Sequence, residues 1–264
     1  MASESRYPAL EDLRRAMGNW SIVRFMALSD MRARYKRSVL GPLWITLGTA
    51  IGSAGLGVLW SELLKVDPKT FVPSLTAGLI IWQLISGVLT DSCSLFGRQA
   101  SIIRNMNLPL SIHPMQLIFK HVINFGHNIP IFFVLALFLS VPMNFNTLLF
   151  IPGFILVSLN LLWICLVVGL LGARFRDFEF MVANVMPLLM FVSPVFYRPN
   201  YLPFSENVIW ANPLSYFIEV IRAPLLGSVP PVFVYQVILS MLVFGWIFAI
   251  WLFNKKHSRV AFWI

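Results

Sequence analysis

Charged residues are scarce in this sequence. Asp, Glu, Lys and Arg together make up 12% of the 264 residues, about half of their share in an average globular protein. Hydrophobic residues make up 58%, above the roughly 45–50% that is usual for soluble domains. This balance excludes a disordered chain, a coiled coil and an ordinary soluble domain. The composition therefore predicts an integral membrane protein.

Cysteine, metal-binding and nucleotide-binding patterns are also sparse. Cys93 and Cys165 are the two cysteines, and without a C-x-x-C pair they favour neither a disulfide framework nor a zinc site, so we expect both to be packing residues. His121 and His127 lie six residues apart, which does not match the i, i+4 spacing of a two-histidine metal site. The sequence has no G-x-x-x-x-G-K-[ST] motif, so this chain cannot bind ATP through a P-loop of its own. It predicts no cofactor and no metal.

Five long stretches contain no Asp, Glu, Lys or Arg, and they locate the membrane spans. An ionised side chain at the centre of a bilayer costs about 2.5–3.5 kcal/mol, so spans avoid such residues. The longest stretch, residues 121–173, is more than twice the roughly 20 residues that one helix needs, and Pro142, Asn144 and Asn146 divide it into two. The sequence thus predicts an all-α polytopic protein with six transmembrane helices, near residues 40–61, 71–90, 121–141, 148–172, 180–197 and 231–254. Because these spans lack ionisable Asp, Glu, Lys and Arg, they argue against an ion-coupled secondary transporter.

The basic residues are distributed unevenly between the two sides of the predicted membrane. Of the 20 Lys and Arg residues, 16 fall on the side that holds both termini and four on the other. The positive-inside rule therefore places both termini in the cytoplasm. The basic residues then serve as anchors near anionic lipid headgroups, and no nucleic-acid partner is expected. The first 37 residues lack an uninterrupted apolar core, so we do not expect cleavage of a signal peptide.

The segment before the first span, residues 1–37, is predicted to be a cytoplasmic amphipathic interface segment, and residues 38–264 to be a six-span transmembrane domain. Leu10, Leu13 and Met17 recur at helical spacing after Pro8. A second helix is expected over residues 20–35, with its basic residues at headgroup depth. Two roles remain open: the segment can anchor the chain at the membrane surface, or it can form a docking surface for a cytoplasmic partner.

Two further segments outside the spans carry helical patterns. The cytoplasmic loop 91–120 predicts a short helix over residues 99–107 with Ile102, Ile103 and Met106 along one side. On the outer side, prolines divide residues 198–230 into short pieces, and Asn212 caps a helix that begins at Pro213. Glu219 and Arg222, three residues apart on that helix, can form an ion pair. This outer segment predicts a re-entrant hairpin between the fifth and sixth spans.

Small residues are concentrated in the first span, where Gly48 and Gly52 form a GxxxG pattern followed by Gly55 and Gly57. Such residues let two helices approach closely. The pattern is compatible with dimerisation and with packing inside one subunit, and both remain open.

Three segments of the sequence form a recognisable set. They are Arg34-Tyr35-Lys36-Arg37-Ser38-Val39-Leu40-Gly41-Pro42-Leu43-Trp44, Ala173-Arg174-Phe175-Arg176-Asp177, and Asn212-Pro213-Leu214 with Glu219 to Arg222. Together they resemble the permease subunits of polysaccharide-export ABC transporters, the family that exports O-antigen, capsule and teichoic acid. The resemblance covers the whole chain in order. The Val39-Leu40-Gly41-Pro42 form and the ending Phe262-Trp263-Ile264 are more similar to the O-antigen branch than to the capsule branch.

The resemblance implies a homodimer of this chain with two copies of a separate ABC nucleotide-binding subunit, which would bind ATP and Mg²⁺. The assembly would lie in the bacterial inner (plasma) membrane among membrane lipids and move an undecaprenyl-diphosphate-linked glycan outward. The implied ATPase-coupling residues are Leu10, Leu13, Met17, Gln99, Ile102, Ile103, Arg104 and Met106. The implied entrance for the lipid diphosphate comprises Arg34, Lys36, Arg37, Leu40 and Gly41. An outer gate within residues 201–226 would include Pro213, Glu219 and Arg222.

Aromatic residues are the candidates for a glycan path, because they present rigid apolar faces with polar tips on Tyr and Trp. The candidates are Trp44, Trp60, Trp82, Phe191, Phe196 and Tyr197. Other functions remain open beside O-antigen export, namely an ABC exporter for capsule, teichoic acid or a small molecule, and a membrane-embedded lipid-modifying enzyme. The enzyme would need a cluster of catalytic groups, for which Glu206, Glu219 and Arg222 are the sparse outer candidates.

Overall fold

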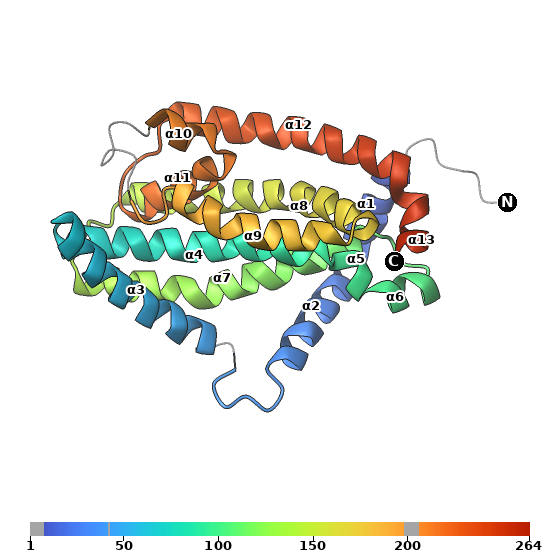
Figure 1. The fold of residues 1–264 in the computed structure, drawn as a ribbon, viewed down its shortest axis with the longest axis horizontal. Coiled ribbons are helices and arrows are strands. Elements are labelled where there is room, and N and C mark those ends of the chain that lie inside the picture. The colour runs from blue at the N-terminus through green and yellow to red at the C-terminus, as the bar shows by residue number, and fades with distance from the viewer. Residues whose placement is uncertain (1–7, 42, 198–205) are drawn as a thin grey trace.

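A computed structural model of the chain describes residues 8–41, 43–197 and 206–264. All of the regular elements in these ranges are helices (Figure 1). The predictions that concern residues 1–7, Pro42 and residues 198–205, including the first part of the predicted outer gate, lie outside the described residues.

Five helical segments are long and apolar enough to cross a membrane. They are α3 (Leu43–Leu64), α4 (Pro68–Cys93), α7 (Ile112–Phe138), the 3-10 helix η1 (Phe145–Leu149) with α8 (Phe150–Arg174), and α12 (Val232–Lys256) with η3 (His257–Arg259) and α13 (Val260–Trp263). The predicted break after the third span is confirmed, since α7 ends at Phe138 and η1 begins at Phe145. The chain is therefore an all-α polytopic membrane protein with five candidate spans.

The remaining predicted span, 180–197, corresponds to a shorter helix. Helix α9 (Asp177–Val192) has 16 residues, fewer than the roughly 20 that cross a bilayer without distortion. Its backbone helix stops at Ser193, whose extended conformation ends the hydrogen-bond ladder. Helix α9 runs alongside the long helices in Figure 1 and contacts α4 and α8.

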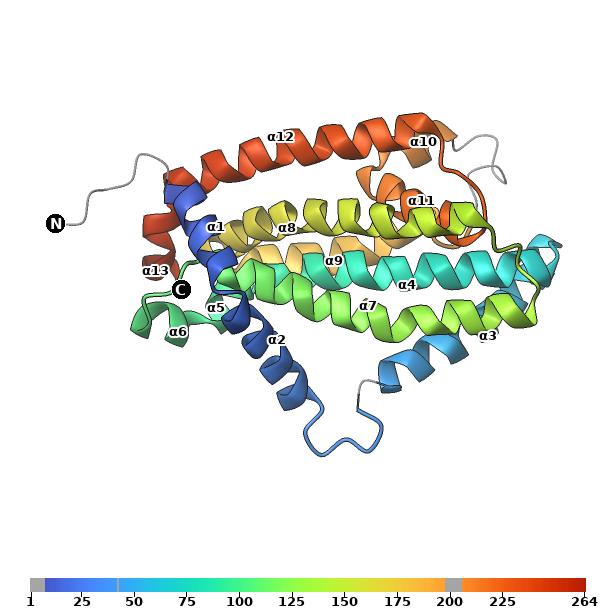
Figure 2. The same ribbon diagram turned by 180° about the vertical axis from the view of Figure 1, so that it is seen from behind.

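The short helices gather at the two ends of the bundle (Figures 1 and 2). One end, which we call the terminal end, carries α1 (Pro8–Gly18), α2 (Trp20–Arg34), α5 (Leu95–Arg98), α6 (Ala100–Asn105) and α13. The other, the hairpin end, carries α10 (Glu206–Ala211) and α11 (Pro213–Leu225). The predicted capped helix is confirmed as α11, because the Asn212 side chain accepts a hydrogen bond from the Leu214 N–H.

Helix α4 forms the core of the bundle, in contact with α3, α7, α8, α9 and α11. Glycines permit the closest approaches between helices. A Cβ at Gly172 of α8 would lie 1.9 Å from the Cys93 carbonyl oxygen of α4, and one at Gly153 would lie 2.6 Å from the Val220 carbonyl oxygen of α11. Cys93 and Cys165 are buried and unpaired, in agreement with their predicted packing role.

The small-residue run of α3 behaves differently along its length. A Cβ at Gly57 would meet the Val72 side chain of α4 at 2.8 Å, whereas Gly48, Gly52 and Gly55 have no neighbouring atom within 4 Å. Only the last glycine of the run therefore takes part in packing within the described part of this subunit.

The leader forms the two expected helices, and each packs against the bundle through a face other than its stripe of large apolar residues. Ala9 and Ala16 of α1 are fully buried, whereas Leu10 and Met17 are exposed. Likewise α2 buries Val23, Ala27 and Met31 instead of its large aromatic residues. Small side chains allow these helices to lie close against the bundle, which leaves the larger apolar residues on the outside.

Candidate functional site

A polar cavity of about 330 Å³ lies at the terminal end, and we call it the basic pocket. Its lining comes from three places that are far apart in the sequence. Helix α2 and its C-cap supply Arg34 and Tyr35, the α5 segment supplies Arg98, and α7 supplies Gln116 and Lys120. Three cations thus surround one cavity at the end of the bundle where the predicted cytoplasmic segments meet.

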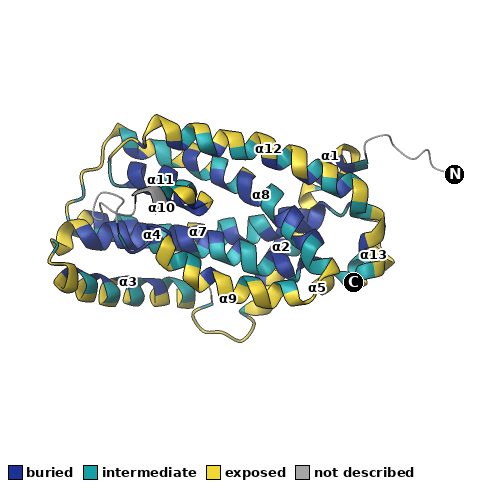
Figure 3. Cartoon of the chain, turned by 45° about the horizontal axis from the view of Figure 1, so that its top comes forward, coloured by how far each residue is buried: buried dark blue, intermediate teal, exposed yellow. Residues whose placement is uncertain are grey.

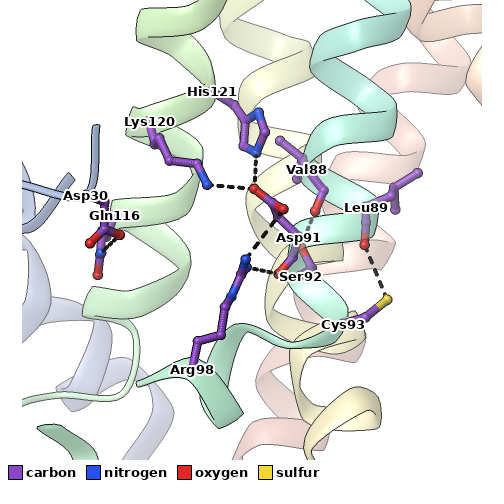
Figure 4. Close-up of polar contacts among 10 residues, drawn as sticks. All are labelled: Asp30, Val88, Leu89, Asp91, Ser92, Cys93, Arg98, Gln116, Lys120 and His121. Atoms are coloured by element: carbon purple, nitrogen blue, oxygen red, sulfur yellow. Dashed lines mark hydrogen bonds and ion pairs between the residues drawn. The ribbon is translucent and has the colours of Figure 1, made fainter. Parts of the chain in front are cut away.

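Asp91, near the end of α4, holds the elements around the basic pocket together (Figure 4). Its Oδ2 atom lies 2.6 Å from Lys120 Nζ and 3.0 Å from His121 Nε2, both on α7. Arg98 of α5 donates to the Asp91 backbone carbonyl at 2.6 Å and lies 3.6 Å from its carboxylate. This cluster, the Asp91 clamp, links α4, α5 and α7.

Two other carboxylates fasten the leader helices to α7. Asp12 of α1 accepts hydrogen bonds from the backbone N–H groups of Leu110 and Ser111, at 2.9 and 2.8 Å. It thereby caps the N-terminus of α7 from a distant part of the chain, where negative charge is favoured by the helix dipole. Asp30 of α2 accepts from the Gln116 side-chain amide at 2.6 Å. The leader and the Asp91 clamp therefore both converge on the first turns of α7.

A second cavity of about 330 Å³ adjoins the basic pocket and shares Arg34 and Asn124 with it. It extends along α4 and α7 as far as Gln83 and Asn128. There Asn128 donates to Gln83 Oε1 at 2.8 Å, and Gln83 donates to the Thr49 hydroxyl of α3 at 2.9 Å. Thr46 of α3 also donates to Asn128 Oδ1 at 3.2 Å. We call this network, which joins α3 to α4 and α7, the polar seam.

The residues predicted at the substrate entrance separate into two groups. Arg34 lines both cavities. Lys36, Arg37, Leu40 and Gly41 lie in the exposed connection between α2 and α3 and do not line the basic pocket. Arg37 and Gly41 have positive φ values of 71° and 53°, so this connection turns sharply, and Gly41 suits such a backbone because it has no Cβ.

The short helix predicted over residues 99–107 is α6 (Ala100–Asn105), and a second short helix, α5, precedes it, with Gln99 between the two. Gln99 lines the basic pocket. Ile102 and Ile103 are half-buried, Arg104 is exposed, and Met106 lies beyond α6 in extended backbone. In the leader, Leu13 packs against the small core around Ala16 and Ile112, whereas Leu10 and Met17 remain exposed. The structure thus brings part of the predicted coupling set to the terminal end, with several of its side chains accessible.

Three of the six candidate path aromatics form one stack near the hairpin end. Phe196 lies 6.0 Å from Trp60 and 5.4 Å from Phe191 between ring centroids. Trp82 is buried in α4 and Trp44 is 60% exposed on α3, so these two are not part of the stack. Tyr197 follows it, and its hydroxyl donates to the Val192 carbonyl at 2.9 Å.

The predicted pair of Glu219 and Arg222 is confirmed, with 2.5 Å between the carboxylate and the guanidinium. Arg222 is 1% exposed, and it also donates to the backbone carbonyls of Pro194 and Tyr197. Pro213 occupies the first turn of α11, next to the Asn212 cap. Arg222 therefore joins α11 to the chain that follows α9, and the pair has a structural role besides any part in an outer gate.

Sequence reasoning missed the polar residues of α4 and α7 that line the two cavities. Asp91, Lys120 and His121 mark the limits of charge-free stretches, so they were placed at or beyond the ends of spans. Gln83 and Asn128 lie inside predicted spans, and polar side chains at such depth are a recognisable sign of contacts between helices. That sign was available in the sequence.

Comparison with known proteins gives a family for this architecture. The model of the ABC-2 type transporter family matches residues 23–226. The chain belongs to this family. It is a permease subunit of a transporter and not an enzyme, and it works with a separate ATPase subunit that binds the ATP.

Individual relatives agree with this assignment. An O-antigen export system permease protein RfbA of Klebsiella pneumoniae is 25% identical over 240 residues, which cover 88% of this chain and 90% of the relative. A second protein of that name and organism is 25% identical over 194 residues, or 72% and 74% of the two chains. The protein of that name from Myxococcus xanthus is 23% identical over 169 residues, or 64% and 65%.

Proposed function

We propose that this chain is the transmembrane subunit of an ATP-driven exporter that moves a lipid-linked surface polysaccharide, with O-antigen as the first candidate. The observation that carries the proposal is the similarity to O-antigen export permeases over nearly the whole chain. The basic pocket adds support, because a cationic cavity beside membrane-spanning helices suits a phosphate-bearing lipid.

The proposed assembly contains two copies of this chain and two copies of an ABC ATPase in the bacterial inner membrane. Both termini face the cytoplasm, as the distribution of basic residues indicates. Helix α9 serves as the sixth span, and α10 with α11 forms a re-entrant hairpin on the outer side, with Glu219 and Arg222 at the outer gate. Residues 1–37 form the cytoplasmic interface segment, and residues 38–264 form the permease domain.

In this proposal the ATPase subunits engage α1 and the α5–α6 segment. Both elements are fastened to α7, through Asp12 and through the Asp91 clamp. A movement of either element is thereby passed to the membrane helices. Lys36, Arg37 and the Leu40-Gly41 turn guide the lipid diphosphate at the entrance, and the aromatic side chains of α3 and α9 border the glycan path.

A deletion strain tests the proposal. We expect cells without this chain to accumulate lipid-linked polysaccharide on the cytoplasmic side and to lose it from the cell surface, with recovery when the gene is restored. A tagged copy of the chain should co-purify with a P-loop ATPase in a one-to-one ratio. Normal surface glycan in the deletion strain would reject polysaccharide export and leave a small molecule as the substrate.

A further inference from the structure

The basic pocket carries positive charge that the protein does not fully neutralise. Arg34, Arg98 and Lys120 line it, and Asp30 is the acidic residue in its lining. Asp91 pairs with Lys120 and Arg98, and Asp30 accepts from Gln116. Within the described ranges the Arg34 side chain has no hydrogen bond or ion pair, although it lines both cavities.

Tyr35 provides a second and independent observation. It lines the basic pocket next to Arg34, and its hydroxyl is buried without a hydrogen-bond partner among the described residues. Buried hydroxyl groups in native proteins are normally paired, because an unpaired one keeps the cost of losing its water contacts. An unpaired donor beside three cations fits an anionic oxygen acceptor.

The shape of the cavities indicates how such an anion would be attached. The second cavity continues from Arg34 and Asn124 along the transmembrane helices α4 and α7. Its wall includes the apolar residues Ile45, Ile80 and Phe125. A molecule with an anionic group in the basic pocket can therefore extend into a partly apolar cavity at membrane depth, as a lipid does and inorganic phosphate does not.

We propose that the basic pocket binds the phosphate or diphosphate group of a lipid, held by Arg34, Arg98, Lys120 and the Tyr35 hydroxyl. Arginine and lysine form short, charge-assisted hydrogen bonds to phosphate oxygens. The binding residues lie on α2, α5 and α7, and the exposed connection from Lys36 to Gly41 is not part of this site. The choice of a polyprenyl diphosphate as one source of the phosphate rests on the proposed function, whereas the site itself does not.

Binding measurements on the complex with its ATPase, reconstituted in phosphatidylcholine nanodiscs, test this assignment. The probes are undecaprenyl diphosphate, phosphatidylglycerol and inorganic diphosphate. We expect Arg34→Gln to weaken the binding of lipid phosphate about 10-fold, the loss of one hydrogen bond between charged groups, and Tyr35→Phe to weaken it about threefold. Arg32→Gln is the matched control, because Arg32 is an exposed cation on the same helix outside the pocket.

The probes distinguish the sources of the phosphate. Pocket-dependent binding of undecaprenyl diphosphate alone supports an export substrate, and equal binding of phosphatidylglycerol supports a general lipid-headgroup site. Binding of inorganic diphosphate without either lipid overturns the proposal, as does an equal response of Arg34→Gln and Arg32→Gln. The melting temperature of each variant separates lost binding from lost folding.

Export in the complemented deletion strain separates this inference from the proposed function. If the wild-type chain restores surface glycan and Arg34→Gln restores it as well as Arg32→Gln does, the pocket assignment fails and the exporter stands. If the wild-type chain binds lipid phosphate through Arg34 but deletion leaves surface glycan unchanged, the exporter proposal fails and the pocket assignment stands.

Discussion

Helices α3 and α4 are neighbours of similar length and apolar character, yet they occupy opposite environments (Figure 3). In the most apolar window of α4, 72% of the residues are buried, against 17% for α3. The buried positions of α4 include large apolar residues such as Phe71, Ile81 and Ile85, whereas those of α3 are Thr49, Ser53, Gly57 and Ser61. Helix α4 is therefore held by apolar packing, and α3 mainly by small residues and the polar seam.

Hydropathy alone therefore does not assign a transmembrane helix to the core or the edge of the bundle. Lipid tails are as apolar as a protein interior, so an exposed Leu47 or Ile51 on α3 costs nothing in a membrane. The position of small and polar residues along one stripe is the better indicator of which face meets another helix.

The largest expected effect comes from adding a methyl group where α8 packs against α4, compared with the same addition on α3. Gly172→Ala places a Cβ 1.9 Å from the α4 backbone at Cys93, where no flexible side chain can yield. We expect a loss of about 3 kcal/mol or more in stability, at the upper end for overpacked cores, visible as a much lower melting temperature in detergent. Gly52→Ala on α3 is the matched control, since open space surrounds Gly52, and it should melt like the wild type. Equal melting of the two variants would contradict the close contact of α8 with α4.

The next largest effect concerns the charged end of α4. Asp91→Asn leaves Lys120, whose side chain is 13% exposed, without its counter-charge. We expect a loss of about 1–3 kcal/mol, less than for a fully buried pair because water still reaches the Asp91 clamp. The double variant Asp91→Asn with Lys120→Met should recover part of this loss, because it removes the uncompensated charge. A double variant less stable than either single variant would show that the two side chains do not act as a pair.

The Asp91 clamp also shows which parts of the structure could be predicted from the sequence and which could not. The order of the helices, the break after α7, the Asn212 cap and the pair of Glu219 with Arg222 all follow from local spacing. The ends of α4 and α7 do not, because Asp91 and Lys120 neutralise each other across two helices and so permit each helix to continue past the charge. A contact between residues 29 positions apart leaves no local pattern in a single sequence.

The same reasoning applies to the candidate site. Arg34 was predicted from the basic segment before the first span, but Arg98, Gln116 and Lys120 join it only through tertiary packing. The packed faces of the leader were missed because alanines at Ala9 and Ala16 give a weak hydrophobic pattern beside Leu10 and Met17. Close packing of small residues depends on the shape of the partner helix, and that shape is not encoded locally.

The polar seam gives the next test of the comparison, since it holds α3 and not α4. Gln83→Leu removes the hydrogen bonds from Asn128 and to Thr49. Hydrogen bonds between membrane helices contribute about 0.6 kcal/mol on average and up to about 1.7, so we expect a small loss of stability. Amide hydrogen exchange should nevertheless rise in α3 and remain unchanged in α4. Gln236→Leu, at an exposed position of α12, is the control and should change neither helix. Equal increases in α3 and α4 would mean that the seam supports the whole bundle.

The smallest effect is expected at the aromatic stack, the other contact that holds α3. Trp60 packs against Phe196 at 6.0 Å between centroids, and an aromatic pair contributes about 0.5–1.5 kcal/mol beyond its buried area. Trp60→Leu keeps an apolar side chain of moderate size and removes the ring, so the change in stability should lie near the lower end of that range. Trp44→Leu, on the same helix but 60% exposed, should change stability less.

Hydrogen exchange in α3 compares the two contacts. If Trp60→Leu raises exchange in α3 as much as Gln83→Leu does, α3 is held equally at both ends, and its movement requires both contacts to open together. If only Gln83→Leu frees it, α3 pivots about the hairpin end, and such a movement would widen the second cavity, which Ile45 of α3 lines.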